Sequence, residues 1–331
     1  MTQPLHFTTG TVVSRDGTTI CYRRVGHGPG LIVAVHGGAQ AAQNLMRLAA
    51  VLADEFTVYL PDRRGRGLSG PPGDDYGLQA ECDDLEALLA ATGATNVFGL
   101  SSGALIALHN ALGRSAAHKV ALYEPPLSID HSTPTAWVER FDREVAEGKL
   151  GSAMITAVRG TQTAPPVLRL LPRSLLAPML NRVARINGDQ PEPEVGSLTE
   201  RPPARRWMLR LLLWPIRRLA SRNTPPHDCA AQHSDVPLGE LVPTMHYDAQ
   251  LVADSEGAWE RYSAVPAEVL LLGGSRSAPY LKRALDALGQ VLPNVRRVEF
   301  PGVGHTAADN TGKPELVARE LRRFYASNEP Q

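Results

Sequence analysis

The 331-residue sequence has little cysteine and no apolar run long enough to cross a bilayer. Its three cysteines, Cys21, Cys82 and Cys229, lie far apart and lack the spacing of a metal site. So few thiols exclude a disulfide-rich scaffold and indicate reduced cysteines. Residues 1–10 have neither the basic start nor the apolar run of a secretory signal. We therefore expect a cytoplasmic protein.

An excess of charge of either sign is also missing. The 34 basic and 34 acidic side chains give a formal net charge of +0. Nothing in this balance attracts nucleic acid or an acidic membrane surface. We expect no nucleic-acid partner and no stable membrane span, and the composition indicates no particular oligomeric state.

Strand and helix patterns alternate at both ends of the chain. The apolar run of residues 30–38 ends in glycines, as a buried strand does, and residues 44–56 then show helical spacing. Such alternation predicts parallel strands with helices on both faces. Residues 126–257 have helical patterns, several prolines and no buried-strand pattern. We predict an α/β core made of residues 1–125 and 258–331, interrupted by a helical insertion.

The motif Gly99-Leu100-Ser101-Ser102-Gly103 lies between a strand pattern and a helix pattern. This G-x-S-x-G sequence in a strand–turn–helix context lifts the hydroxyl of Ser101 above a sheet, near a helix N-terminus. Developing negative charge is favoured there. Ser101 is therefore the candidate nucleophile, and the alternative is a glycine-rich turn with two capping serines.

Two further motifs follow predicted strands. The stretch His36-Gly37-Gly38 resembles a loop that supplies one backbone N–H of an oxyanion hole, here that of Gly38, with Ser102 supplying the second. His305 lies in a glycine-rich loop near the C-terminus, from which a base can reach the strand ends. The alternatives are a tight strand exit with a structural His36 and a solvated loop histidine.

Together these motifs resemble the α/β-hydrolase superfamily. Residues 62–69, "DRRGRGLS", add the D-x-R-G-x-G-x-S stretch often seen after the fourth strand of those enzymes. The resemblance covers almost the whole chain. It implies a mostly parallel central sheet with helices on both faces, an inserted helical lid over residues 126–257, and a Ser–His–acid triad that acts on an acyl group without a cofactor or metal.

The usual position of the triad acid, after the seventh strand, has no carboxylate, since residues 273–279 read "GGSRSAP". Some members of the superfamily place the acid after the sixth strand, where this chain has Glu124 followed by two prolines that stiffen the backbone. There Glu124 would accept the Nδ1–H of His305. Asp309 and Asp248 are the alternatives, and a third is that no acid works.

The predicted lid contains a segment, residues 204–220, that interleaves apolar residues with arginines. It is either a basic amphipathic helix for a membrane or partner, or a lid helix whose arginines extend outward. Trp207 from this segment, with His36 and Asp248, is a candidate to line the substrate pocket.

The function that we expect is hydrolysis of a carboxylic ester or lactone, or of a thioester, by Ser101, His305 and Glu124. The helical lid favours a small, mostly apolar acyl substrate. The alternatives are an acyltransferase or cyclising enzyme that uses the same triad, and a ligand-binding member of the fold without catalysis.

Overall fold

A single eight-stranded sheet, in the order β1-β2-β4-β3-β5-β6-β7-β8, forms the centre of the protein. The computed structural model describes residues 6–113, 115–163, 171–186, 235–257 and 259–326. Strands β1 (Phe7–Val13) and β2 (Thr19–Val25) form an antiparallel hairpin, and β2 is also antiparallel to β4 (Phe56–Pro61). From β4 to β8, every pair of neighbouring strands in the sheet is parallel. The strands beyond β4 are β3 (Gly30–Val35), β5 (Asn96–Leu100), β6 (Lys119–Tyr123), β7 (Glu268–Gly274) and β8 (Val295–Phe300).

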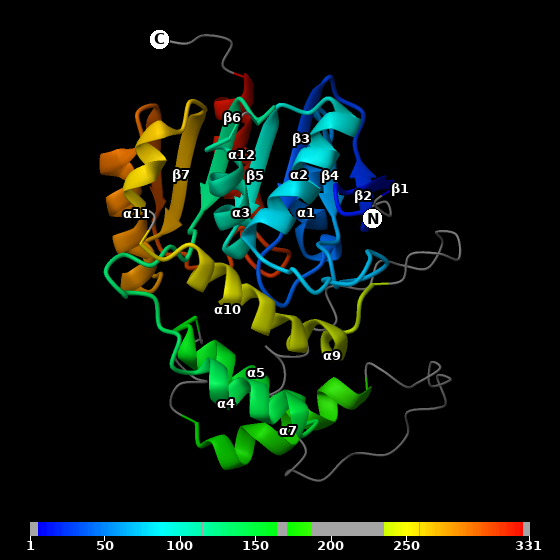
Figure 1. The fold of residues 1–331 in the computed structure, drawn as a ribbon, viewed down its shortest axis with the longest axis vertical. Helices are drawn as coiled ribbons and strands as arrows, with labels where there is room; N and C mark the ends of the chain where they lie inside the picture. Colours follow the sequence, from blue (N-terminus) through cyan, green and yellow to red (C-terminus); the bar gives the residue numbers. More distant parts are fainter. Residues whose placement is uncertain (1–5, 114, 164–170, 187–234, 258, 327–331) are drawn as a thin grey trace, which may run out of the picture.

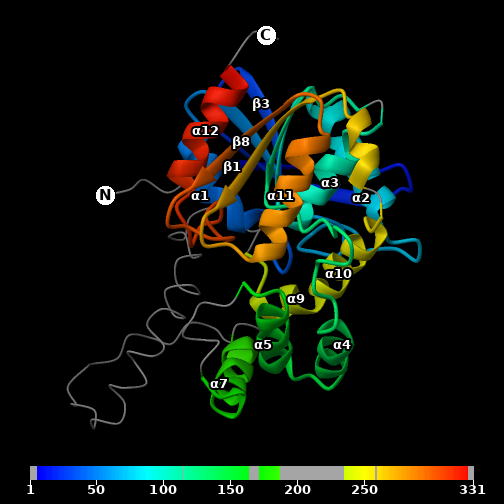
Figure 2. The same ribbon diagram turned by 90° about the vertical axis from the view of Figure 1, so that its left-hand side faces the viewer.

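Helices cover both faces of the sheet (Figures 1 and 2), as the alternating pattern predicts. Successive side chains of β3 point to opposite faces, so that Val33 joins one apolar core cluster and Ile32 the other. The cluster with Val33 includes side chains of α2 (Leu78–Thr92), α3 (Ser102–Asn110) and α11 (Pro279–Val291). The cluster with Ile32 includes side chains of α1 (Met46–Leu52) and α12 (Pro314–Ala326).

One predicted helix is shorter than its sequence pattern. Residues 44–56 have helical spacing, but the structure has the 3₁₀-helix η1 (Ala42–Leu45), then α1, which ends at Leu52. Phe56 instead begins β4, where it is buried and packs edge-on against Tyr325 of α12. Packing in the sheet therefore decides the end of the helix.

Helices inserted between β6 and β7 lie together beyond one end of the sheet (Figure 1). They are α4 (Val138–Ala146), α5 (Leu150–Gly160), α7 (Arg173–Ile186), α9 (Leu238–Leu241), η2 (Val242–Thr244) and α10 (Met245–Asp254). The 3₁₀-helix η3 (Trp259–Ala264), which follows them, instead packs on a face of the sheet, where Tyr262 joins the core cluster that contains Val33. None of the described residues of this insertion forms a strand. The arginine-rich segment 204–220, with Trp207, lies outside the described residues. No helix in the described part of the chain is long and apolar enough to cross a membrane.

Residues 235 and 236, which lead into α9, make polar contacts with the core. Gln43 of η1 pairs with the backbone of Val236, accepting its N–H at 2.7 Å and donating to its carbonyl at 2.8 Å. Arg23 of β2 forms an ion pair with Asp235 at 3.0 Å. These contacts fix where the inserted segment returns to the sheet.

The turn from β5 into α3 brings backbone into close contact with β3. A Cβ atom at Gly103 would lie 2.4 Å from the carbonyl oxygen of Val35 and 2.5 Å from that of His36. Both contacts are with backbone, which cannot move aside as a flexible side chain can. Glycine at position 103 therefore allows the first turn of α3 to pack against the end of β3.

We predict that Gly103→Ala destabilises the protein by about 1–3 kcal/mol, the usual cost of overpacking a well-packed core. The matched control is Gly289→Ala in α11, where an added Cβ would have no neighbour within 4 Å. Alanine there should stabilise the protein by about 0.5–1 kcal/mol, because it restricts the unfolded chain. Urea unfolding of the three proteins measures both effects, and equal midpoints for Gly103→Ala and wild type would contradict the close contact.

Candidate active site

Ser101 lies at the sharp turn between β5 and α3. Its backbone has φ 56° and ψ −121°, a conformation that non-glycine residues rarely adopt. The turn is held by the Ser101 N–H, which donates to the carbonyl of Tyr123 at 2.9 Å. The sequence around the G-x-S-x-G motif thus forms the predicted strand–turn–helix, with Ser101 immediately before the first residue of α3.

The structure brings Ser101, His305 and Glu124 into one hydrogen-bonded chain. His305 Nε2 lies 3.0 Å from Ser101 Oγ, and His305 Nδ1 lies 2.7 Å from Glu124 Oε2. Glu124 is completely buried, whereas the side chain of His305 is 17% exposed. A carboxylate can only accept, so Nδ1 carries the donated hydrogen and Nε2 faces the serine hydroxyl. This arrangement allows His305 to take a proton from Ser101.

The last residue of β7 and the loop after it, which has no carboxylate of its own, supply donors to Glu124. The Gly274 N–H donates to Glu124 Oε1 at 2.6 Å, and the Ser277 hydroxyl donates to the same oxygen. Glu124 itself follows β6 with φ 48°, and its N–H donates to the carbonyl of Leu272 at 3.1 Å. The two carboxylate oxygens therefore serve different partners, one toward His305 and one toward the β7 loop.

Asp309, an alternative acid from the sequence, makes its hydrogen bonds elsewhere. Its Oδ1 accepts the backbone N–H of Thr311 at 2.8 Å and the Thr311 hydroxyl at 2.6 Å. Its Oδ2 accepts from Gln40 Nε2 at 3.3 Å. Burial raises the pKa of Asp309 above its usual value. The carboxyl group thus braces the loop that carries His305 and links it to the loop after β3.

The loop after β3 brings Gly37 and Gly38 close to Ser101. A Cβ atom at Gly37 would lie 3.0 Å from Ser101 Cβ, and the Gly37 N–H donates to Gln40 Oε1 at 3.0 Å. Ser102 is the first residue of α3, and the first N–H groups of a helix have no partner within the helix. The Gly37 N–H is thus already used, which leaves Gly38 and Ser102 as the candidate oxyanion donors.

The prediction that His36 lines the substrate pocket does not agree with the structure, in which His36 is completely buried. Its Nδ1 donates to the carbonyl of Gly37 at 2.9 Å, and its Nε2 accepts the backbone N–H of Arg63 at 3.2 Å. Burial lowers the pKa of His36 well below its usual value, and the nearby Arg66 and Arg63 lower it further. A neutral ring with both nitrogens bonded to backbone fits a structural role better than contact with substrate.

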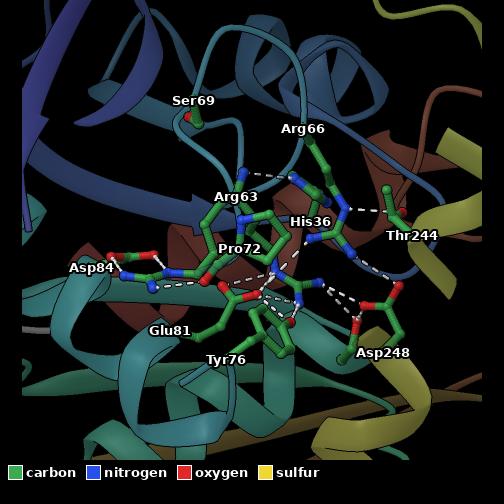
Figure 3. A network of polar contacts seen from close by, with 12 residues as sticks. His36, Arg63, Arg66, Ser69, Pro72, Tyr76, Glu81, Asp84, Thr244 and Asp248 are labelled. Carbon is green, nitrogen blue, oxygen red and sulfur yellow. Dashed lines mark hydrogen bonds and ion pairs between the residues drawn. The ribbon is translucent and has the colours of Figure 1, made fainter. Parts of the chain in front are cut away.

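Asp248, on α10, reaches the first turn of α3. Its Oδ1 accepts the Ser102 hydroxyl at 2.7 Å and Arg63 Nη1 at 2.8 Å, and its Oδ2 accepts Arg66 Nη2 at 2.9 Å (Figure 3). Burial alone would raise the pKa of this carboxyl, but Arg66 and Arg63 hold it far below its usual value. The carboxylate is therefore committed to protein partners, and its contact with a substrate stays a prediction.

The other contacts of this buried network have no counterpart among the predictions from the sequence. Arg63 Nη2 also forms an ion pair of 2.6 Å with Glu81 of α2, and the hydroxyl of Tyr76 donates to Glu81 at 2.7 Å (Figure 3). The available signal was the stretch "PDRRGRG", since arginines that directly follow a buried strand need carboxylate partners.

A family model described as the alpha/beta hydrolase family matches residues 32–320. The chain belongs to this family. An alpha/beta hydrolase from Sphaerobacter thermophilus DSM 20745 is similar in structure, with a TM-score of 0.67 and 27% identity over 96% of this chain and 100% of that one. The α/β-hydrolase fold predicted from the sequence is thereby confirmed.

Curated relatives match a shorter part of the chain. N-formylmaleamate deformylase from Pseudomonas putida is 34% identical over 126 residues, which cover 37% of this chain and 47% of the relative. An uncharacterized hydrolase from Bacillus subtilis is 35% identical over 133 residues, 38% of this chain and 48% of the relative. The matched part spans about half the length of each relative, of which one is named a deformylase and the other a hydrolase.

The burial of His36 in this α/β hydrolase predicts a loss of stability in mild acid. The unfolded chain binds a proton at a pKa near 6.5, while the folded pKa is depressed, so stability is complete above about pH 6.5 and falls below it. This histidine should contribute a slope of up to about 1.4 kcal/mol per pH unit between pH 6.5 and 5.

Urea unfolding of wild type and His36→Gln from pH 7.5 to 5 measures that slope. We expect the slope of the variant to be smaller, whatever its absolute stability. His109, whose pKa burial lowers to about 4, contributes a slope of the same sign, so both proteins are best compared in a His109→Gln background. Parallel curves for the two proteins would refute the assignment to His36.

Proposed function

We propose that the protein is a serine hydrolase that cleaves a carboxylic ester or lactone through Ser101, His305 and Glu124. The observation that carries this proposal is the continuous chain from Glu124 Oε2 through His305 to Ser101 Oγ, with links of 2.7 and 3.0 Å. Acyl transfer by a serine requires three groups. They are a hydroxyl, a base that can take its proton, and a carboxylate that orients the base.

In the proposed reaction, Ser101 Oγ attacks the substrate carbonyl while His305 Nε2 takes the hydroxyl proton. The N–H groups of Gly38 and Ser102 hold the oxyanion of the tetrahedral intermediate. His305 then gives the proton to the leaving oxygen, and an acyl-serine forms. Water, deprotonated by the same His305, attacks the acyl-serine. His305 then returns the proton to Ser101 Oγ as the bond to the acyl group breaks, which releases the carboxylic acid and the free enzyme.

Glu124 fits the role of the acid because it fixes the ring of His305 and stabilises its positive charge after proton transfer. Donors from Gly274 and Ser277 hold its other oxygen, so the carboxylate cannot rotate away from the ring. Positioning of this kind is worth several orders of magnitude in rate.

A small-molecule acyl substrate is supported by the family and by the relative that is named a deformylase, although the alignment covers only 47% of that protein. Ser101 as the nucleophile favours hydrolysis through an acyl-serine. Acyl transfer to an alcohol or amine would use the same groups, and product analysis with and without an added acceptor separates the two reactions.

We predict that a fluorophosphonate labels wild type once, at Ser101, and that Glu124→Gln slows this labelling by about 10²- to 10⁴-fold. Three donors converge on the carboxylate, from His305, Gly274 and Ser277. A glutamine offers them one oxygen only, and its neutral amide does not stabilise the charged imidazole. Intact mass over time, with peptide mapping, measures the rates.

The matched control is Asp309→Asn, which changes a buried carboxyl on the His305 loop but none of the three links. Its labelling rate should stay near that of wild type. Slow labelling of Asp309→Asn together with fast labelling of Glu124→Gln would show that the acid is Asp309, and labelling of Ser101→Ala would overturn the proposed nucleophile.

A further inference from the structure

One side chain of the inserted segment contacts both residues whose N–H groups are proposed to bind the oxyanion. Asp248 Oδ1 accepts the hydroxyl of Ser102 at 2.7 Å. A Cβ atom added to Gly38 would lie 3.0 Å from Asp248 Oδ2 and 3.0 Å from Met245 Sδ. Helix α10 therefore packs against both proposed donor residues, and Asp248 lies beside each of them.

A carboxylate at this place would oppose an oxyanion unless its charge were compensated. Arg63 and Arg66 both donate to Asp248, at 2.8 and 2.9 Å. Glu81 supplies the second negative charge, with an ion pair of 2.6 Å to Arg63 and a distance of 3.9 Å to Arg66. The four side chains are buried, with exposures between 2% and 6%, and their formal charges sum to zero. The cluster thus provides a rigid acceptor for Ser102 without adding net negative charge beside the proposed hole.

Arg66 makes this cluster depend on the inserted segment. Its hydrogen bonds go to Thr244 at 3.1 Å and Asp248 at 2.9 Å, both in that segment (Figure 3). Its Nη1 has no hydrogen-bond partner among the described residues and lies 3.9 Å from Glu81 Oε1. Without α10 in place, Arg66 would lose both hydrogen bonds and keep only the distant Glu81, so the charge pairing with Asp248 favours the seated position of α10.

We propose that Asp248 is a positioning residue, which fixes the oxyanion donors of Ser102 and Gly38 and so makes their geometry depend on the seating of α10. This inference rests on the proposed function of Ser101 and its oxyanion hole. Arg63 Nη1 donates to Ser102 Oγ at 3.0 Å while Ser102 donates to Asp248, which holds the side chain in one rotamer. The first turn of α3 is thereby fixed at the residue whose N–H faces the reacting carbonyl.

The test is a double-mutant cycle with Ser102→Ala and Asp248→Asn, followed by hydrolysis of a p-nitrophenyl ester. Ser102→Ala keeps the backbone N–H and loses only the hydroxyl. Each single variant should lower kcat by about 10-fold with a much smaller change in KM, because the donors act on the transition state. The double variant should be no slower than Asp248→Asn alone, since both changes break the same contact.

The matched control is Asp235→Asn. This change breaks the ion pair between Asp235 of the inserted segment and Arg23 of β2, neither of which belongs to α3. Its effect on kcat should be small and should add to that of Ser102→Ala. The pH profile of kcat/KM should be the same in wild type and Asp248→Asn, because His305 and Glu124 are unchanged.

The outcomes separate the two proposals. Wild type that neither turns over any ester nor is labelled at Ser101 would overturn the proposed function. Wild type that is active while the effects of Ser102→Ala and Asp248→Asn simply add, or while either variant keeps the wild-type kcat, would overturn the role of Asp248 alone. If Asp248→Asn does not fold, Ser102→Ala decides by itself, because an unchanged kcat there contradicts the inference.

Discussion

The completely buried carboxylate of Glu124 is the group on which the rest of the site depends. A buried carboxylate is costly unless donors satisfy both oxygens. Those donors come from the loop after β7 and from the loop after β8, which carries His305. The parallel order β6-β7-β8 brings the ends of these strands side by side, so pairing the charge and assembling the candidate active site are one process.

The sequence alone was sufficient for the fold, and it nominated the three residues that the structure brings together. Glu124 was inferred because residues 273–279 lack a carboxylate and a glutamate follows the preceding strand. The sequence could not show why that loop suits a carboxylate from its neighbour. The Gly274 N–H and the Ser277 hydroxyl reach Glu124 only across the register of β6 and β7, which no local pattern encodes.

The limits of the sequence are clearest for His36 and Asp248. His36 lies two residues before Gly38 in the sequence, and Asp248 contacts Ser102 in space. A place in the substrate pocket was therefore a reasonable prediction for each. Which way a side chain turns depends on distant partners: His36 turns to the backbone of Arg63, and Asp248 meets Arg63 from a helix 185 residues further along. The motif of residues 62–69 revealed the arginines, but their partners on α2 and α10 come from the tertiary fold.

Asp248 and Glu124, two of the buried carboxylates near Ser101, have different partners, and the difference fits different roles. Asp248 is paired with arginines, which keep their protons at any ordinary pH, so its contact with Ser102 does not change as a reaction proceeds. Glu124 is paired with the imidazole of His305, which in the proposed reaction takes a proton from Ser101 and then gives it up. A carboxylate between two arginines can hold geometry, whereas one beside the proposed base can stabilise the charge that proton transfer creates on the ring. The partner of each carboxylate, more than the carboxylate itself, decides its role: Glu124 assists the proposed proton transfer, and Asp248 holds structure.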